Sequence, residues 1–163
     1  MSIMTRLHEL LNETEWTHEV DEANDLIRVR ALGQACTYEM TLLAWDDSNT
    51  ALVYTFTPIR VPENMLLTVS EFIVRANYDI AIGGLNLDYA KGDLSFKVAI
   101  AAFPESMKSS ELDSLLWLGP LYCNQYLPGV MSIIYGNIEA EAAYDGCSEE
   151  VGSSEDQAIT QGH

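Results

Sequence analysis

The sequence predicts an α+β domain built on an antiparallel sheet, with elements in the order helix, three to four strands, helix, two strands, helix. Apolar residues recur at helical spacing in three segments, so each of these segments has one face suited to packing. The segments between them alternate apolar and polar residues, which is the period of a half-buried strand. The links between the strands are short and rich in turn residues, which favours antiparallel hairpins over parallel crossovers.

Two of the expected helices carry a clear apolar stripe. The first is expected at residues 2–13, and the second after Pro62, because proline suits the first position of a helix. The second stripe runs from Met65 to Ala76. Asn77 is expected to end this helix, since asparagine tolerates the left-handed conformation found at helix ends. Both helices are amphipathic and need another element to pack on.

The third helical pattern runs from residue 109 to residue 136 and contains two prolines, Pro120 and Pro128. A proline inside a helix removes one backbone hydrogen bond and costs roughly 3 kcal/mol. We therefore expect this segment to form either a bent helix or two shorter helices.

The strands are expected in two groups. The first group lies between residues 15 and 60 and contains three turn-rich links. The second group is a hairpin at residues 80–103, in which Gly83 and Gly84 interrupt the alternation of the first strand. In the second strand of this hairpin, Leu94 to Ala102, apolar and polar positions alternate cleanly, which strongly indicates a strand.

The chain is expected to form one domain over residues 1–138, followed by a tail over residues 139–163. Its 163 residues fall within the usual size of a single domain. From Glu139 onward there are seven acidic residues and no Lys or Arg, and this composition predicts a disordered tail. The net charge is −17 for the whole chain and −10 for residues 1–138, so the domain itself is acidic.

The charge and the motif search exclude several classes of function. Phosphate backbones and anionic lipids attract clusters of Lys and Arg, so neither nucleic acid nor a membrane is an expected partner. The three cysteines are scattered without a C-x-x-C pair, and the N-terminus lacks the apolar core of a signal peptide, which together favour a cytoplasmic protein with reduced thiols. The three histidines are not at metal-ligand spacing, and no nucleophile or phosphate-loop motif occurs. We therefore expect no catalytic residue, no cofactor and no metal site.

Pairs of acidic residues in turns are the remaining candidates for carboxylate chemistry. They are Asp46 with Asp47, and Asp88 with Asp93. Aspartate is common in turns because its side chain accepts hydrogen bonds from the nearby backbone. Solvated turn residues therefore explain both pairs better than a catalytic site does.

One observation points to a binding surface. Leu43 and Trp45 are apolar on one phase of a strand whose other phase, Leu42 and Ala44, is apolar as well. A sheet that helices cover on one face needs only one apolar phase. Either helices cover both faces, or the second face contacts another molecule, because large exposed apolar patches usually mark partner sites.

The candidate partner-binding surface consists of Leu43, Trp45, Tyr54 and Phe56. On a sheet face, aromatic residues of this kind can form an exposed strip that a partner protein covers. The alternative is that they belong to the core or form half-buried pairs across neighbouring strands.

Several short motifs in this chain resemble those of a known family. They are the strand end at Pro58 to Pro62, the pair Asn77 and Tyr78, Gly83 or Gly84 before Leu85 to Asp88, the run Gly92 to Phe96, and Tyr126 to Pro128. With these motifs the chain resembles the YbjN family of bacterial sensory transduction regulators over roughly residues 10–136. The family is similar in fold to type III secretion chaperones, which are often dimeric. The resemblance implies this fold and a homodimer, and it implies no catalytic residue.

The resemblance and the empty motif search together predict a non-enzymatic protein-binding domain, regulatory or chaperone-like, whose partner is another protein. A second class of function stays open, which is a small-ligand sensor or an undescribed enzyme. It would use a pocket between the hairpin at residues 80–103 and the last helix, and its support in the sequence is the double glycine and the nearby Asp88.

Overall fold

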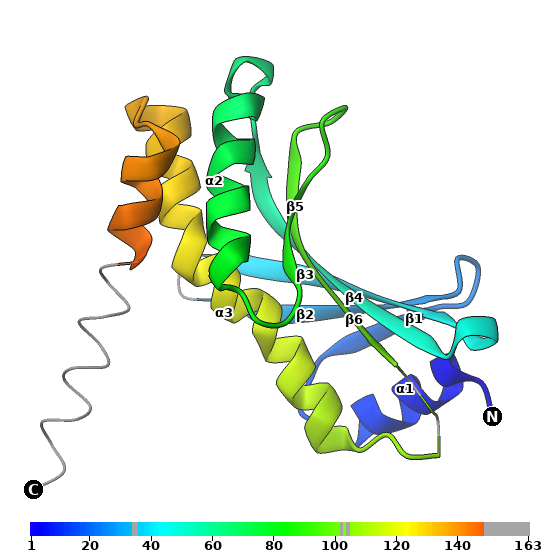
Figure 1. The fold of residues 1–163 in the computed structure, drawn as a ribbon. Coiled ribbons are helices and arrows are strands. Elements are labelled where there is room, and N and C mark those ends of the chain that lie inside the picture. The colour runs from blue at the N-terminus through cyan, green and yellow to red at the C-terminus, as the bar shows by residue number, and fades with distance from the viewer. Residues whose placement is uncertain (34–35, 102, 104, 149–163) are drawn as a thin grey trace, which may run out of the picture.

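The computed structural model describes residues 1–33, 36–101, 103 and 105–148, and it has the predicted order of elements (Figure 1). Helix α1 (Ile3–Asn12) is followed by the four strands β1 (His18–Asp21), β2 (Leu26–Leu32), β3 (Thr37–Trp45) and β4 (Thr50–Arg60). Helix α2 (Leu66–Asp79), strands β5 (Gly84–Leu87) and β6 (Asp93–Ala101) and helix α3 (Ser109–Gly136) come next. Residues 140–148 form a further helix.

The six strands form one antiparallel sheet in the order β1-β2-β3-β4-β6-β5. In this register Leu43 lies opposite Leu52, and Thr41 lies opposite Tyr54. Because side chains alternate along a strand, Leu43 and Tyr54 are on one face of the sheet while Leu42 is on the other. The sheet therefore has apolar residues on both faces, as the sequence predicts.

Helices α1, α2 and α3 pack on the face that carries Leu42. The core there combines alternate residues of the central strands with the apolar stripes of the helices, and its largest members include Leu10, Met40, Phe72, Phe96 and Leu116. In Figure 1, α3 runs from the end of the molecule that holds α1 to the side of α2. None of the helices that the structure describes packs on the opposite face of the sheet.

Helix α2 differs from the prediction at both ends. Pro62 precedes a short 3-10 turn (Glu63–Met65), and the α-helix itself begins after this turn. The helix also continues past Asn77 to Asp79. The side chain of Asn77 accepts a hydrogen bond from the Leu85 N–H (2.8 Å) and donates one to the Leu85 carbonyl (3.0 Å). Asn77 therefore ties α2 to the edge strand β5 instead of ending the helix.

Helix α3 is one continuous helix of 28 residues although Pro120 and Pro128 lie inside it. Of the two expected outcomes, the split into two shorter helices is wrong. Gly119 has no Cβ, which relieves the steric conflict that Pro120 imposes on the residue before it. The same glycine allows α3 to approach β4, since a Cβ at this position would lie only 2.6 Å from the Cβ of Thr55.

The helix at residues 140–148 corrects the expectation of a disordered tail from residue 139. Ala140, Ala143 and Cys147 are buried, and their spacing places them on one face of the helix. The Tyr144 hydroxyl donates a hydrogen bond to the carboxylate of Asp79 at the end of α2. The acidic composition suggested disorder, but three small residues on one face are sufficient for close packing. Residues 149–163, the rest of the predicted tail, lie outside the described residues.

Candidate functional site

The predicted partner-binding surface lies on the sheet face opposite the helices, which we call the open face. Leu43 and Trp45 lie on β3, and Tyr54 and Phe56 lie on β4, with all four side chains on this face. The rings of Tyr54 and Phe56 are stacked, with centroids 5.7 Å apart and an interplanar angle of 19°. Trp45 is 48% exposed and Phe56 41% exposed, while Leu43 and Tyr54 are half-buried. The structure thus brings the four predicted residues together on one face.

Charged residues border these side chains. Lys97 lies opposite Tyr54 on β6 and forms no ion pair with any described residue. Arg30 and Glu39 form an exposed ion pair of 3.6 Å across β2 and β3. A hollow of about 520 Å³ at this border is lined in part by Arg30, Glu39 and Phe56. The open face therefore combines an aromatic centre with a charged margin, which is the usual anatomy of a protein interface.

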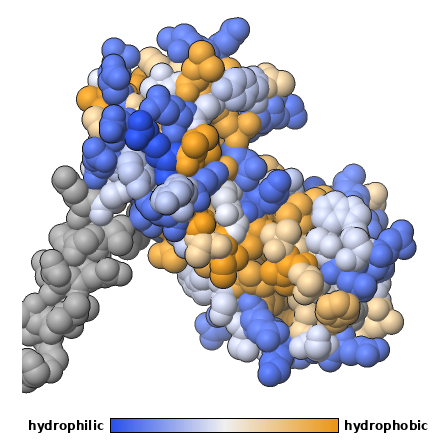
Figure 2. Space-filling view, in the orientation of Figure 1, coloured by the Kyte–Doolittle hydropathy of each residue, from blue (hydrophilic) through white to orange (hydrophobic). Residues whose placement is uncertain are grey.

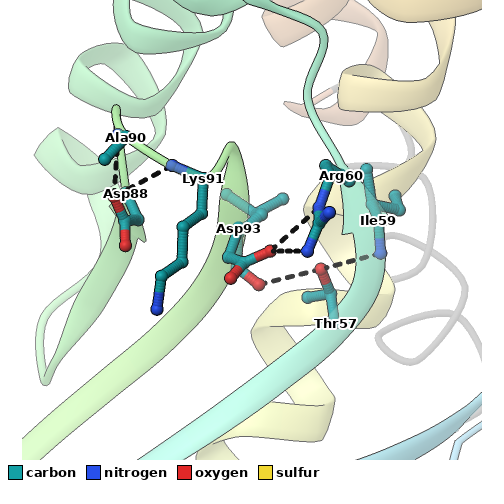
Figure 3. Close-up of polar contacts among 8 residues, drawn as sticks. Thr57, Ile59, Arg60, Asp88, Ala90, Lys91 and Asp93 are labelled. Carbon is teal, nitrogen blue, oxygen red and sulfur yellow. Dashed lines mark hydrogen bonds and ion pairs between the residues drawn. The ribbon is translucent and has the colours of Figure 1, made fainter.

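The acidic residues of the turn between β5 and β6 have structural roles (Figure 3). One carboxylate oxygen of Asp88 accepts hydrogen bonds from the backbone N–H groups of Ala90 (2.8 Å) and Lys91 (3.2 Å). Asp93 accepts hydrogen bonds from the guanidinium of Arg60 at 3.4 Å. The Asp88 carboxylate thus holds the turn itself, and the Asp93 carboxylate links the start of β6 to the end of β4.

The other acidic candidate is also used locally, because Asp46 accepts a hydrogen bond from the N–H of Ile3 at 2.8 Å and so anchors the start of α1. Within the described part of the chain, no group of three or more His, Cys, Asp or Glu side chains is placed to hold a metal ion. His8 and His18 contact each other with ring centroids 5.4 Å apart, which the sequence did not predict. None of the helices built from described residues is both long and apolar enough to cross a bilayer.

Burial keeps two groups near the core protonated. It raises the pKa of the Cys123 thiol to about 12. It also raises the pKa of the Tyr126 hydroxyl to about 12. The thiolate is the reactive form of cysteine, so Cys123 is not an activated nucleophile at neutral pH.

The region between the β5–β6 hairpin and α3, where the alternative hypothesis places a ligand pocket, holds an aromatic contact. Phe96 of β6 is fully buried and stacks on Tyr122 of α3, with ring centroids 5.4 Å apart. Gly83, which immediately precedes β5, is close to the same phenyl ring, since a Cβ there would lie 2.6 Å from the Phe96 Cζ. Gly83 therefore accommodates packing against Phe96, whereas Gly84 lies beside the side chain of Asn77.

A family model matches residues 4–131, which is well over half of the chain, and its description reads "YbjN: Putative bacterial sensory transduction regulator". The chain belongs to the YbjN family. No curated protein matches the sequence. Among solved structures, one titled "Structure of the HopA1-SchA Chaperone-Effector Complex" has a chain similar to this YbjN protein. The two chains share 18% sequence identity over 72% of this chain and 85% of that chain, with a TM-score of 0.45.

The motifs that resemble the YbjN family have structural roles in this member. Pro58 lies where the pairing of β4 with β6 shifts its register, between Phe56 and Arg60. A proline fits there because it has no N–H to donate to a regular ladder. Gly92 has a φ of 74°, and a Cβ there would collide with the carbonyl of Val61. Pro58 and Gly92 of these YbjN motifs thus determine the backbone path at the ends of β4 and β6. Neither belongs to the predicted partner-binding surface.

A second exposed apolar cluster of this YbjN protein was missed in the sequence. Leu32 at the end of β2 is 83% exposed, and Trp117 and Leu121 on α3 are 50% and 59% exposed. The ring of Trp117 contacts that of Trp16, with centroids 4.7 Å apart. Trp117 and Leu121 are four residues apart and therefore share one face of α3. That spacing was visible in the sequence, but the neighbours of this face depend on the tertiary fold.

Proposed function

We propose that this YbjN protein is a non-enzymatic protein-binding domain, regulatory or chaperone-like, and that it binds another polypeptide with the open face of its sheet. The observation that carries the proposal is the cluster of Leu43, Trp45, Tyr54 and Phe56 on a face that none of the described helices covers. Covering these side chains with a partner removes apolar surface from water. Aromatic side chains such as Trp and Tyr contribute most of the binding energy at many protein interfaces.

The chemistry of the described residues supports a binding role over catalysis. Asp46, Asp88 and Asp93 are engaged in capping and turn contacts, and the Cys123 thiol stays protonated. We place the protein in the bacterial cytoplasm, and the free thiols of Cys36 and Cys123 support a reducing compartment.

The proposal includes self-association into a homodimer. Helix α2 exposes an apolar stripe that consists of Leu67, Val74 and Tyr78, which are 79%, 71% and 90% exposed. Their spacing of seven and four residues places them on one face, which suits packing against a second helix. Analytical ultracentrifugation at micromolar concentration is expected to show a dimer, and Leu67→Ser with Val74→Ser is expected to convert it to a monomer. A wild-type chain that sediments as a monomer would remove this part of the proposal.

Affinity capture from a lysate of the source organism tests the open face. The wild-type chain is expected to retain a protein partner in stoichiometric amount, and the double variant Trp45→Ser, Phe56→Ser is expected to lose it. Both side chains are substantially exposed, so these changes should leave the fold intact. The matched control is Tyr135→Ser on α3, which removes an exposed aromatic side chain from the helical side of the sheet. Capture that is the same for all three chains would overturn the proposal.

A thermal-shift screen against metabolites and nucleotides tests the alternative of a ligand sensor or enzyme. A ligand that binds the folded state raises the melting temperature. The aromatic contact of Phe96 with Tyr122 leads us to expect no ligand-specific rise. A reproducible rise with one metabolite would favour the alternative instead.

A further inference from the structure

The two edges of the sheet differ in how their backbone groups are used. At the β5 edge, the side chain of Asn77 bonds both the N–H and the carbonyl of Leu85, so this outward-facing residue has no free backbone group. An edge strand with unpaired groups is a template for another strand, and such a contact closes the template. At the opposite edge, formed by β1 and the end of β2, no described side chain bonds both the N–H and the carbonyl of an outward-facing residue in this way.

Strand β2 extends beyond its pairing with β1. The last link between them is the hydrogen bond from the Arg30 N–H to the Thr17 carbonyl at 3.2 Å. Before Thr17 the chain turns away from the sheet, and the indole N–H of Trp16 donates a hydrogen bond to Asp113 on α3 at 2.8 Å. Leu32, the last residue of β2, therefore has no neighbour from β1.

The register shows which backbone groups face the unpaired edge. The Gly33 N–H donates to the Cys36 carbonyl at 2.9 Å, so odd-numbered residues of this stretch bond toward β3. The Leu32 N–H and the Arg30 carbonyl consequently point away from β3. Among the described residues neither group has a hydrogen-bond partner. This short stretch of β2 is therefore an open template for an added strand.

A groove runs beside this edge. Its main part has a volume of about 990 Å³, and its lining includes Trp16, Leu32 and Trp117. A second hollow of about 410 Å³ shares Leu32 and Trp117 with the first and extends to Leu121. Figure 2 shows that apolar residues gather elsewhere on the surface too, so exposed apolar area alone does not distinguish this groove. Its distinguishing feature is that exposed apolar side chains lie next to unpaired backbone groups.

The charge of the groove indicates which partner fits. Its charged lining residues are Glu13, Glu15, Asp113 and Arg30, and Arg30 already pairs with Glu39. The groove is thus acidic, on a chain whose net charge is −17. Complementary Lys or Arg residues on a partner would be attracted, whereas an acidic partner would be repelled.

We infer that this groove, formed by the β2 edge at residues 30–32 with Trp16 and Trp117, binds an extended segment of a partner polypeptide that carries bulky apolar side chains beside Lys or Arg. The segment pairs with the Arg30 carbonyl and the Leu32 N–H and places an apolar side chain against the tryptophans. The inference rests on the proposed function of polypeptide binding, but it locates a second contact at the edge of the sheet, centred on Trp16 and Trp117 and not on the aromatic residues of the open face.

Selection of random short linear peptides displayed on phage against the full chain tests the inference. We expect the selected peptides to combine bulky apolar residues with Lys or Arg, and their binding to weaken as salt is added. With a synthetic copy of a selected peptide, Trp117→Ala is expected to raise the Kd about tenfold or more, as for an aromatic anchor. Tyr135→Ala, at an exposed residue of α3 outside the groove, serves as the control and is expected to leave this Kd unchanged. Phe56→Ser reports whether the peptide lies on the open face instead.

Two substitutions at one position test strand addition itself. Leu32→Pro removes the free N–H without disturbing the ladder to β3, and Leu32→Ala shortens the side chain but keeps the N–H. Proline is tolerated at a strand edge whose N–H faces outward. We expect Leu32→Pro to weaken peptide binding several-fold more than Leu32→Ala, with melting temperatures confirming that both variants fold.

The outcomes separate this inference from the proposed function. Selection of acidic peptides, or a Kd that depends on Phe56 and not on Trp117, would overturn the inference and leave open-face binding intact. The same conclusion would follow if no peptide were selected while a captured partner still required the open face. A homodimer that Trp117→Ala dissociates would identify a second copy of the chain as the occupant and would also overturn the inference. If partner capture does not depend on Trp45 and Phe56 while selected peptides still require Trp117, the proposed function alone is overturned.

Discussion

The substitution Asn77→Ala tests how the β5 edge of the sheet is held. It removes the two hydrogen bonds from the Asn77 side chain to the N–H and the carbonyl of Leu85, a residue that is only 4% exposed. A buried backbone group without a partner costs about 1–3 kcal/mol, and two such groups are created here. Since these bonds are only partly buried, the lower part of the range applies, and alanine recovers up to roughly 0.7 kcal/mol through its higher helix propensity. The expected loss of unfolding free energy is therefore about 2 kcal/mol.

Urea denaturation followed by circular dichroism measures this loss, with the slope of the free energy against urea checked for two-state behaviour. Asn64→Ala is the matched control, because Asn64 is exposed and its side chain makes no hydrogen bond with a described residue. We expect the control to change the unfolding free energy by less than about 0.5 kcal/mol. If Asn77→Ala behaves like the control, water replaces the amide and the side chain does not hold the edge.

Three further predictions concern the core and the helices. Gly119→Ala places a Cβ against Thr55, so it is expected to lower the unfolding free energy by roughly 3 kcal/mol. An unchanged midpoint in urea denaturation would show that α3 can move away from β4. Ala143→Asp buries a carboxylate under the helix at residues 140–148 and is expected to lower the unfolding free energy by at least about 2 kcal/mol. Ala142→Asp, on the exposed side of the same helix, is expected to be nearly neutral. Equal shifts of the melting temperature for the two variants would refute this packing. Burial raises the pKa of Cys123 from 9.0 to about 12, so the unfolded thiol ionises first and stability should fall as pH rises from about 9 toward 12. Urea denaturation across that range should show a smaller fall for Cys123→Ala, and equal falls would contradict the prediction.

The strands were predictable because their signal is local. Alternation of apolar and polar residues sets the faces of β3 and β6, and the register that follows puts Leu43 and Tyr54 on the face opposite Leu42. The candidate surface could therefore be assembled from the sequence. Whether a helix covers that face depends on packing, so the sequence left this alternative open.

The differences arise where a tertiary contact overrides a local preference. The sequence predicts a helix end at Asn77, but the side-chain amide of Asn77 bonds the backbone of β5 and the helix continues to Asp79. Pro120 predicts a bend or break in the helix. Because Gly119 before it lowers the steric cost, α3 remains one continuous helix. Residues 140–148 read as an acidic tail, but Ala140 and Ala143 meet a packed surface.

The groove beside β2 could not be predicted for a related reason. It forms because the chain leaves the sheet at Trp16 and because α3 crosses the edge with Trp117 facing outward. Neither event is encoded in a short motif. The register of the sheet shows the unpaired Leu32 N–H once the whole fold is assembled.

Site-specific photo-crosslinking tests whether the open face of the sheet contacts another polypeptide. A photoreactive phenylalanine analogue is placed at Phe56 on the open face or, as the control, at the exposed Tyr135 on α3, and the protein is irradiated inside living cells. We expect a discrete covalent adduct with another polypeptide from position 56, which the additional change Trp45→Ser diminishes. No adduct from position 56, or adducts of the same pattern from both positions, would contradict the claim that the open face is a polypeptide-binding surface.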